Sequence, residues 1–338
     1  MENTLTLYVR YLAKPGCRET FLRQLTTHGI IDAIRREDGC LRYDYFLSVQ
    51  NADEILLVEQ WQTEQQQQAH LRAPHMDQLR RLKSEYVADT HAHYDDDQFD
   101  GDRETLLAPL PEQGVGLVVN PGCTVASSRT AVELARRFPH VYAAVGIHPE
   151  NCGDFRPEDL DAIRALARED KAVAIGEIGL DYYWPENPPR PLQQQVLRSQ
   201  LALARELSLP VIIHDRDAHA DTMAIVREFP GLRGVFHCFA GSVEMARELV
   251  DMGWYLSFNG AATFKNARKA PEVIRAVPMD RLMIETDAPY LTPAPYRGRR
   301  NDSTYVRLVA ERIAQLRDMT PAAVEQATWE NGKRFFGI

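Results

Sequence analysis

The sequence predicts an α/β protein: a (β/α)₈ barrel of the TIM type, preceded by a small ferredoxin-like α+β domain. After residue 85, eight short apolar runs alternate with segments of helical periodicity, a pattern typical of parallel strands joined by right-handed crossovers. Before residue 85, the order of predicted elements is strand, helix, strand, strand, helix. We therefore expect a ferredoxin-like domain over residues 1–87 and a barrel over residues 88–338.

The ferredoxin-like domain begins with a half-buried strand, because apolar side chains recur at every second position from Leu5 to Tyr11. Residues 15–36 have the periodicity of a helix. Two β-rich runs follow, at residues 41–47 and 54–61, and the polar segment Gln50–Asp53 between them predicts a hairpin.

A second helix is predicted after this hairpin. Thr63 and Gln66 match a capping box, and the helix is expected to run to about Ser84. The fourth strand of a complete ferredoxin-like domain is missing from the pattern, because the next apolar run is needed by the barrel. The absence of a Gly/Ser or Pro-rich linker predicts direct packing of the two domains.

The barrel is predicted from eight units in roughly 250 residues, the usual size of a (β/α)₈ domain. The expected strands are Tyr86–His93, Val115–Pro121, Val141–Pro149, Ala172–Asp181, Val211–Arg216, Gly234–Phe239, Tyr255–Gly260 and Arg281–Pro289. The clearest expected helices are Ala126–Phe138, Glu158–Arg168, Leu192–Leu207, Ala218–Phe229, Val243–Met252, Ala267–Val277, Tyr305–Arg317 and Ala322–Phe336.

Four histidines and two carboxylates lie at the expected C-terminal ends of these strands: His91, His93, Glu177, His214, His237 and Asp287. Barrels of this type gather their site residues at that end of the sheet. We therefore expect these six side chains to surround two divalent metal ions. Each histidine taken alone is better explained as an ordinary core residue, and it is the recurrence on five strands that favours a metal centre.

Residue types suggest a role for each predicted ligand. His91 and His93, two positions apart on a strand, point to the same side and can chelate one ion. Glu177 follows a buried apolar run, so its carboxylate needs a metal or a buried arginine; we expect it to bridge both ions. His214 and His237 would complete the coordination of the second ion. Asp287 would bind the first ion and accept a proton from its water.

Further residues are expected around this centre. His148 is assigned to phosphate or leaving-group contact, and a core histidine is the alternative. Glu285 is expected to point to the opposite side of the last strand and to be structural, and Cys238 to be a small buried hydrophobe. Five basic residues near strand ends suit a phosphate, or alternatively solvate loops and pair with acids: Arg216, Lys265, Arg297, Arg299 and Arg300.

Composition narrows the function class. The 338 residues carry a net charge of -9, which argues against broad wrapping of duplex nucleic acid by a basic face. The five cysteines include no Cys-x-x-Cys pair, so a disulfide framework or thiolate zinc site is not expected. No apolar run approaches the roughly 20 residues that span a bilayer, and no secretory signal is visible, so we expect a cytoplasmic protein without a membrane partner.

The barrel resembles the TatD family of metal-dependent deoxyribonucleases. The resemblance covers residues 88–338 and rests on the segments Asp89–His93, Val145–Pro149, Gly176–Asp181, Val211–Arg216, Phe236–Gly241 and Glu285–Pro289. It implies a metallo-dependent hydrolase barrel of the amidohydrolase superfamily, a two-metal site from the six residues named above, and 3′-to-5′ exonuclease action on DNA, single-stranded or at 3′ ends.

Two departures from the family pattern concern substrate contacts. Glu150 stands where a histidine is often found, and Arg300–Ser303 replaces an Arg-Asn-Glu-Pro segment.

The predicted ligands also bear on the choice of metal. Four imidazoles favour zinc, manganese or iron over magnesium on ligand grounds, whereas the family is usually described as magnesium-dependent. Mg²⁺, Mn²⁺ and Zn²⁺ all stay open. The alternative on the same barrel is a deacylase or amide hydrolase, which would leave the arginine-rich loop idle.

The first domain resembles antibiotic-biosynthesis-monooxygenase domains, which are dimeric. The resemblance rests on Gly39–Tyr43, Val58–Trp61 and Ala69–Met76. It implies a homodimer through this domain. Some members oxidise quinols or degrade haem, so His75 or Trp61 facing a ligand, with a monooxygenase or ligand-binding activity here, is a further alternative. The simpler expectation is that Trp61 packs in the core and His70 and His75 lie on a helix face.

Overall fold

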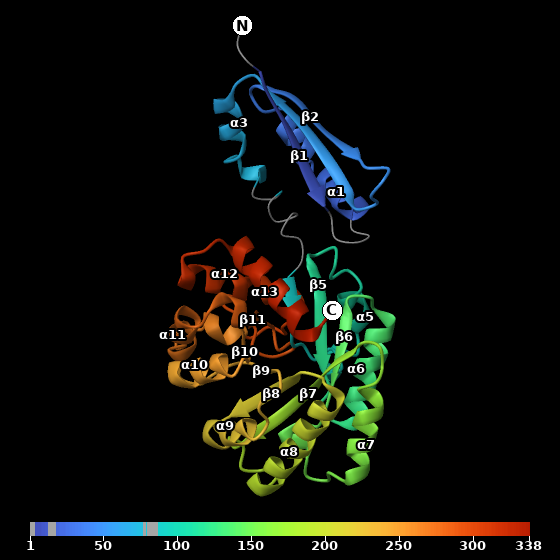
Figure 1. The fold of residues 1–338 in the computed structure, drawn as a ribbon, viewed down its shortest axis with the longest axis vertical. Helices are drawn as coiled ribbons and strands as arrows, with labels where there is room; N and C mark the ends of the chain where they lie inside the picture. The colour runs from blue at the N-terminus through green and yellow to red at the C-terminus, as the bar shows by residue number, and fades with distance from the viewer. Residues whose placement is uncertain (1–3, 13–17, 77–78, 80–86) are drawn as a thin grey trace. The chain divides into compact units, whose positions relative to one another are not determined.

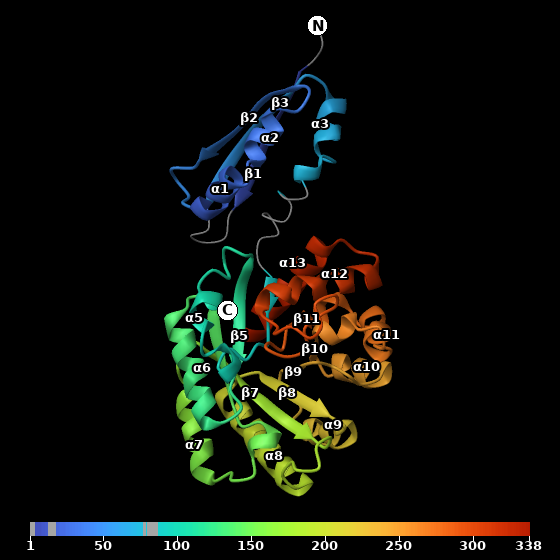
Figure 2. The ribbon, with the colours of Figure 1, turned by 180° about the vertical axis from the view of Figure 1, so that it is seen from behind.

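The structure is a computed structural model that describes residues 4–12, 18–76, 79 and 87–338. The chain divides into two compact units, Met1–Glu85 and Tyr86–Ile338, which are described separately (Figures 1 and 2). Within the described ranges, no helix is both long and apolar enough to cross a membrane.

The N-terminal unit packs helices on one face of an antiparallel sheet. The described elements are β1 (Leu5–Leu12), α1 (Arg18–Thr27), α2 (Ile30–Arg35), β2 (Cys40–Leu47), β3 (Glu54–Trp61) and α3 (Glu64–His70). The strand order is β1-β3-β2, so the predicted hairpin is confirmed. The core is formed mainly by large apolar side chains: Phe21, Leu25, Ile34, Tyr43, Ile55, Leu57 and Trp61.

The helices of this unit differ from the prediction. The helix expected over residues 15–36 is divided, because Gly29 has φ +64°, a left-handed conformation that a continuous helix cannot contain. The second helix is opened by Thr63 as predicted, its hydroxyl accepting from Gln66 N at 3.3 Å, but α3 ends at His70. Pro74, which lacks an N–H and disfavours helix before it, follows this break. The predicted continuation beyond Met76 lies largely outside the described residues.

The second unit is an eight-stranded parallel barrel. Its strands are β4 (Val87–Asp89), β5 (Val115–Pro121), β6 (Val141–Val145), β7 (Ala172–Asp181), β8 (Val211–Arg216), β9 (Gly234–Phe236), β10 (Tyr255–Phe258) and β11 (Leu282–Ile284), in sequential order. The ring closes just beyond β4 and β11, where Ala92 bridges Ala288 and the Asp287 N–H donates to the His91 carbonyl at 2.9 Å.

Helices lie around the outside of these strands (Figures 1 and 2). They are α5 (Arg103–Leu107), α6 (Val125–Arg137), α7 (Pro157–Leu166), α8 (Arg190–Leu207), α9 (His219–Arg227), α10 (Val243–Asp251), α11 (Lys269–Ala276), α12 (Val306–Arg317) and α13 (Pro321–Phe336). Every helix listed in the prediction for the barrel is present with bounds shifted by a few residues, and the short α5 was not predicted. The apolar faces of these helices pack on the outer side of the sheet and form most of the core.

Five strands are shorter than predicted: β4, β6, β9, β10 and β11. The early ends of β4, β9 and β11 affect the predicted ligands, because His91, His93, His237 and Asp287 then lie in the loops just past the sheet. Cys238 and Asp287 have φ values of 44° and 59°, which end an extended strand. The backbone therefore turns at the rim, and the side chains there converge instead of alternating between two faces.

Candidate metal centre

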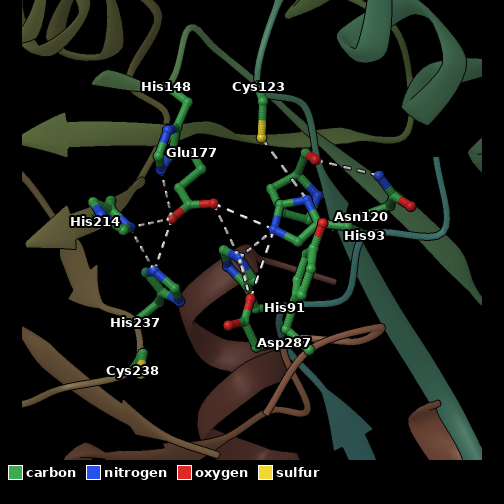
Figure 3. A network of polar contacts seen from close by, with 12 residues as sticks. His91, His93, Asn120, Cys123, His148, Glu177, His214, His237, Cys238 and Asp287 are labelled. Atoms are coloured by element: carbon green, nitrogen blue, oxygen red, sulfur yellow. Dashed lines mark hydrogen bonds and ion pairs between the residues drawn. The ribbon is translucent and has the colours of Figure 1, made fainter. Parts of the chain in front are cut away.

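Five histidines and two carboxylates meet at the C-terminal rim of the barrel, with Glu177 at their centre (Figure 3). The other six are His91, His93, His148, His214, His237 and Asp287. All but His91 contribute to the lining of a cavity of about 840 Å³. The carboxylate of Glu177 is only 2% exposed, so its charge is removed from water and must be balanced by these neighbours.

One oxygen of Glu177 faces the first group of donor atoms. Glu177 Oε2 lies 3.2 Å from His91 Nε2 and 3.4 Å from His93 Nε2. Asp287 Oδ1 lies 3.6 Å and 3.7 Å from the same two nitrogens, which are 3.0 Å apart. Ligands about 2.1 Å from a tetrahedral ion are about 3.4 Å from one another. These four atoms therefore have the spacing of a coordination shell for one divalent cation.

The other oxygen of Glu177 faces a second group. Glu177 Oε1 lies 2.7 Å from His237 Nε2, 2.9 Å from His214 Nδ1 and 3.5 Å from His148 Nε2. His214 Nδ1 and His237 Nε2 are 3.2 Å apart. The described ion pairs of Glu177 are all with histidines, so the alternative of a buried arginine partner is not supported. A carboxylate whose two oxygens face different sets of imidazoles has the chemistry of a bridging ligand.

Backbone geometry brings Glu177 to this central position. It lies on β7, whose register with β8 shifts between Ile175 and Ile178. The Glu177 N–H donates to the carbonyl of Gly122 at 3.0 Å. This irregularity lets the side chain enter the barrel rim while both neighbouring apolar residues stay buried.

A second layer of acids orients the histidines. His214 Nε2 lies 3.0 Å from Asp181 Oδ2, and His237 Nδ1 lies 3.3 Å from Glu285 Oε1. The hydrogen bond of His214 holds the proton on its outer nitrogen and leaves the inner one free for a metal, whereas His237 Nδ1 is only within ion-pair distance of Glu285. The sequence-based expectation for Glu285 was wrong in its direction: because the chain turns at Asp287, Glu285 faces His237, and it also accepts from Cys238 N at 2.7 Å.

Asp181 was not predicted as a site residue, although its place at the end of an apolar strand was the available signal. The Asp89 carboxylate anchors the opposite side of the rim, accepting from Thr286 N at 2.8 Å and Thr286 Oγ1 at 2.6 Å. Asn301 is fully buried and donates to the carbonyls of Thr286 and Tyr290. This asparagine therefore holds the loop that carries Asp287.

The protonation states follow from burial and from these neighbours. Burial raises the pKa of Glu177, but the charges of His237 and His91 lower it well below its ordinary value. Burial, together with the charge of His214, lowers the pKa of His148 to about 4, so this ring is neutral at neutral pH. Burial lowers the pKa of His214, but hydrogen bonds to Asp181 and Glu177 raise it to about 9.

Comparison with known proteins identifies the barrel. A model of the TatD-related DNase family matches residues 88–337. The chain belongs to the TatD-related DNase family. It is a metal-dependent hydrolase, and the family resemblance, the enzyme class and the barrel fold expected from the sequence are confirmed.

Three relatives show how similar this TatD-family barrel is to known proteins. A metal-dependent hydrolase of Bacillus subtilis strain 168, YabD, is 46% identical over 252 residues, which are 74% of this chain and 98% of the relative. The 3′-5′ ssDNA/RNA exonuclease TatD of Cronobacter sakazakii is 36% identical, over 71% of this chain and 93% of its own. The crystal structure of the TatD homologue YjjV from Escherichia coli K12 has a TM-score of 0.71 at 30% identity, covering 75% and 99% of the chains.

The basic residues predicted to bind substrate lie in different surroundings in this TatD-family barrel. Arg216 lines the cavity, whereas Arg297 and Arg299 line a neighbouring pocket of about 360 Å³ and Lys265 is exposed. Arg300 also lines this pocket, but it pairs with Asp102 through both terminal nitrogens, at 2.5 Å and 3.0 Å. The structure thus brings Arg216 to the metal centre and leaves the other four outside its lining.

The N-terminal unit matches a model of the antibiotic biosynthesis monooxygenase family over residues 4–82. Trp61 is fully buried and packs on His70, with ring centroids 4.7 Å apart. His70 Nδ1 and His75 Nε2 lie 2.8 Å and 2.5 Å from the same oxygen of Glu37. The two histidines and Glu37 therefore form a polar cluster at the edge of the core, and Trp61 packs in the core as the simpler expectation had it.

Proposed function

We propose that this chain hydrolyses phosphodiester bonds of DNA, single-stranded or at 3′ ends, by a two-metal mechanism, and that it acts as a 3′-to-5′ exonuclease. One observation carries the proposal: the two oxygens of Glu177 face two separate groups of donor atoms. The named activity of the Cronobacter sakazakii relative supports the choice of a nucleic acid substrate.

The ligands are assigned from the donor atoms. His91, His93, Asp287 and Glu177 Oε2 would hold the first ion, and His214, His237 and Glu177 Oε1 the second. Bound there, Mg²⁺, Mn²⁺ or Zn²⁺ would supply a hydroxide at neutral pH and polarise the phosphoryl group. The imidazole-rich second group favours Mn²⁺ or Zn²⁺, since nitrogen ligands suit these ions better than Mg²⁺.

Two side chains of the protein are assigned to proton acceptance and hydrogen-bond donation in the reaction, Asp287 and His148. Asp287 is half-buried and lies beside the first group, where its second oxygen can accept the proton of the attacking water. His148 is assigned to the phosphate or leaving-group oxygen. Its Nδ1 accepts from Glu150 N at 3.3 Å, so the neutral ring carries its proton on Nε2, which faces the cavity side of Glu177. A neutral N–H at this point can donate to an oxygen but is a poor metal ligand.

The test combines metal analysis with a substrate panel. Full-length protein is stripped with EDTA, reloaded with each metal in turn, and assayed on 3′- and 5′-labelled single-stranded DNA, duplex DNA, and acyl and amide substrates. Two equivalents of metal and progressive loss of the 3′ label would support the proposal. Turnover of acyl or amide substrates with intact DNA would replace it with the deacylase alternative.

The N-terminal unit is proposed to form a homodimer through the outer face of its sheet. Tyr8, Phe46 and Leu56 are 72%, 43% and 37% exposed and lie on that face. Phe46 is directly opposite Leu56, and Tyr8 is opposite Val58. Charged residues surround this apolar strip, including the pair Arg42–Asp44. An exposed apolar patch with a polar rim is typical of a protein–protein interface.

A further inference from the structure

We propose that Trp184 and Tyr183 form a subsite that stacks an unpaired nucleobase of the substrate, while Arg216 binds the adjoining phosphate. This inference rests on the proposed nuclease function and deepens it. Both aromatic residues lie on the loop between β7 and α8, and neither was predicted from the sequence as a site residue.

The position of Trp184 is the first observation. Its side chain lines the same cavity as Glu177 and His148, so a ligand in that cavity meets both the metal centre and the indole. Trp184 is 43% exposed and Tyr183 48% exposed. The other tryptophans, Trp61, Trp254 and Trp329, are buried. A large aromatic surface left open beside a catalytic cavity indicates a ligand that covers it.

The surroundings of Arg216 are the second observation. Its guanidinium carbon lies 3.8 Å from the centre of the Tyr183 ring and 5.3 Å from that of Trp184. Arg216 forms no ion pair within 4.0 Å in the described part of the chain. Stacking on the aromatic rings therefore fixes the direction of this cation without neutralising it, and its hydrogen-bond donors stay available for a phosphate.

The loop is held in place by the metal centre itself. Asp181 Oδ1 accepts from Tyr183 N at 2.9 Å and from Asn187 Nδ2 at 3.0 Å. The other oxygen of Asp181 lies 3.0 Å from Nε2 of His214. One carboxylate thus ties the aromatic loop to a ligand of the second group. The platform is preorganised, so binding costs little ordering of the loop.

A nucleobase is the ligand that matches these features. Base–aromatic stacking next to a cation that follows the backbone is the usual way in which proteins hold single strands without sequence preference. In a duplex both faces of a base are covered by its neighbours, so the platform would accept only an unpaired or terminal base. The subsite would thereby select single strands and frayed ends.

Intrinsic fluorescence tests the stacking directly. Full-length protein in EDTA is titrated with a short thymidine oligonucleotide, with the same oligonucleotide carrying abasic sites, and with a duplex. Stacking on Trp184 is expected to quench the emission with the first ligand and not with the other two. The variant Trp184→Leu is expected to show no quenching, because its remaining tryptophans are buried.

Affinity and kinetics give the second readout. Binding of a fluorescein-labelled oligonucleotide, followed by anisotropy, is expected to weaken about tenfold in Trp184→Leu and to recover in Trp184→Phe, as for loss and restoration of one stacked base. The KM for single-stranded DNA should rise by a similar factor, with kcat and turnover of bis-p-nitrophenyl phosphate unchanged.

The outcomes separate this inference from the proposed function. Unchanged affinity and KM in both Trp184→Leu and Tyr183→Leu, in a protein that still degrades single-stranded DNA, would overturn the subsite alone. Equal quenching by the abasic oligonucleotide would also overturn it, because a base would then not be the stacked group. Failure of the metal-loaded parent protein to cleave any phosphodiester would overturn the proposed function instead.

Discussion

At the scale of single residues, the convergence of the six candidate ligands could be predicted, because each one follows an apolar run with a polar side chain. A buried imidazole or carboxylate is costly without a partner, and five such interruptions at strand ends point to a shared one. The orienting residues could not be predicted in the same way. Asp181 and Glu285 act through contacts that depend on backbone turns. An alternating strand pattern in the sequence does not show that Asp287 has a left-handed backbone conformation.

Replacement of Asp287 tests the proposed proton acceptor. We expect Asp287→Asn to lower kcat on single-stranded DNA by about 100- to 10,000-fold, the usual contribution of a general base, because the amide cannot take the proton. The melting temperature should change little. Exposed Asp161, which pairs with Arg164 on the surface of α7, provides the control variant Asp161→Asn. Full activity of Asp287→Asn with normal metal content would refute the assignment.

Replacement of Asp181 tests the second layer of the metal centre. Asp181→Asn weakens the hydrogen bond that orients His214. We expect the affinity of the second metal group to fall by about 10- to 100-fold, the usual effect of losing such a contact. Isothermal titration of the EDTA-treated protein with Mn²⁺ would measure the affinity of each metal group separately. An equal loss of affinity at both groups would mean that Asp181 acts on the whole rim.

At the scale of elements, the helices of the barrel were predicted well because long amphipathic segments carry a strong periodic signal. Strand ends were predicted less well. β4, β9 and β11 stop where the side chains turn inward, and that turn is decided by hydrogen bonds to distant segments, such as Asp287 N–H to the His91 carbonyl. In the N-terminal unit, Gly29 and Pro74 divided helices that periodicity alone had joined.

The start of α9 supports a prediction about pH. His219 Nδ1 lies 2.7 Å from Asp215 Oδ2, and this hydrogen bond raises the pKa of His219 above its ordinary value of 6.5. Since the folded pKa exceeds the unfolded one, the stabilisation is complete below pH 6.5 and is lost as the pH rises through the raised value. We expect His219→Gln to lower the melting temperature more at pH 6 than at pH 9. A loss that is equal at both pH values would contradict this account.

At the scale of the whole molecule, the two units differ in the chemistry of their most exposed or reactive surfaces. The barrel holds a buried, charge-rich centre that is balanced when cations bind. The N-terminal unit is a small sheet with an apolar outer face. The architecture of both could be predicted from element order, since alternating strands and helices allow few topologies. The homodimer of the N-terminal unit was expected only from the family resemblance, and the face proposed to form it could be identified only once the sheet register was known.

Metal binding should stabilise the barrel. At a free Mn²⁺ concentration 100 times the Kd, a site that exists only in the folded state adds about 2.7 kcal/mol to the free energy of unfolding. For a domain of this size we expect the barrel transition to move up by several degrees in scanning calorimetry. Glu177→Gln, which loses the bridging carboxylate, should show a much smaller shift. An equal shift in this variant would argue for binding elsewhere.

The apolar face of the N-terminal sheet leads to the last prediction. A charge in the centre of an apolar contact is expensive to bury, so we expect Leu56→Glu and Phe46→Glu to shift the full-length protein from dimer to monomer. Light scattering after size-exclusion chromatography measures the change. The exposed residue Gln68 on α3, changed to Glu, is the control. A parent protein that is monomeric at high concentration would exclude this dimer.

The closure of the barrel between its first and last strands, β4 and β11, has a consequence for the order of events during translation. The proposed ligands of the first ion lie on both sides of the point where β4 and β11 close the barrel, and the adjoining contact between Asp89 and Thr286 joins residues 197 positions apart. A ribosome must therefore release nearly the entire barrel before His91, His93 and Asp287 can meet. We therefore expect a nascent chain to bind no cation at the first group, and to have no hydrolytic activity, until the segment that carries Asp287 has left the ribosome.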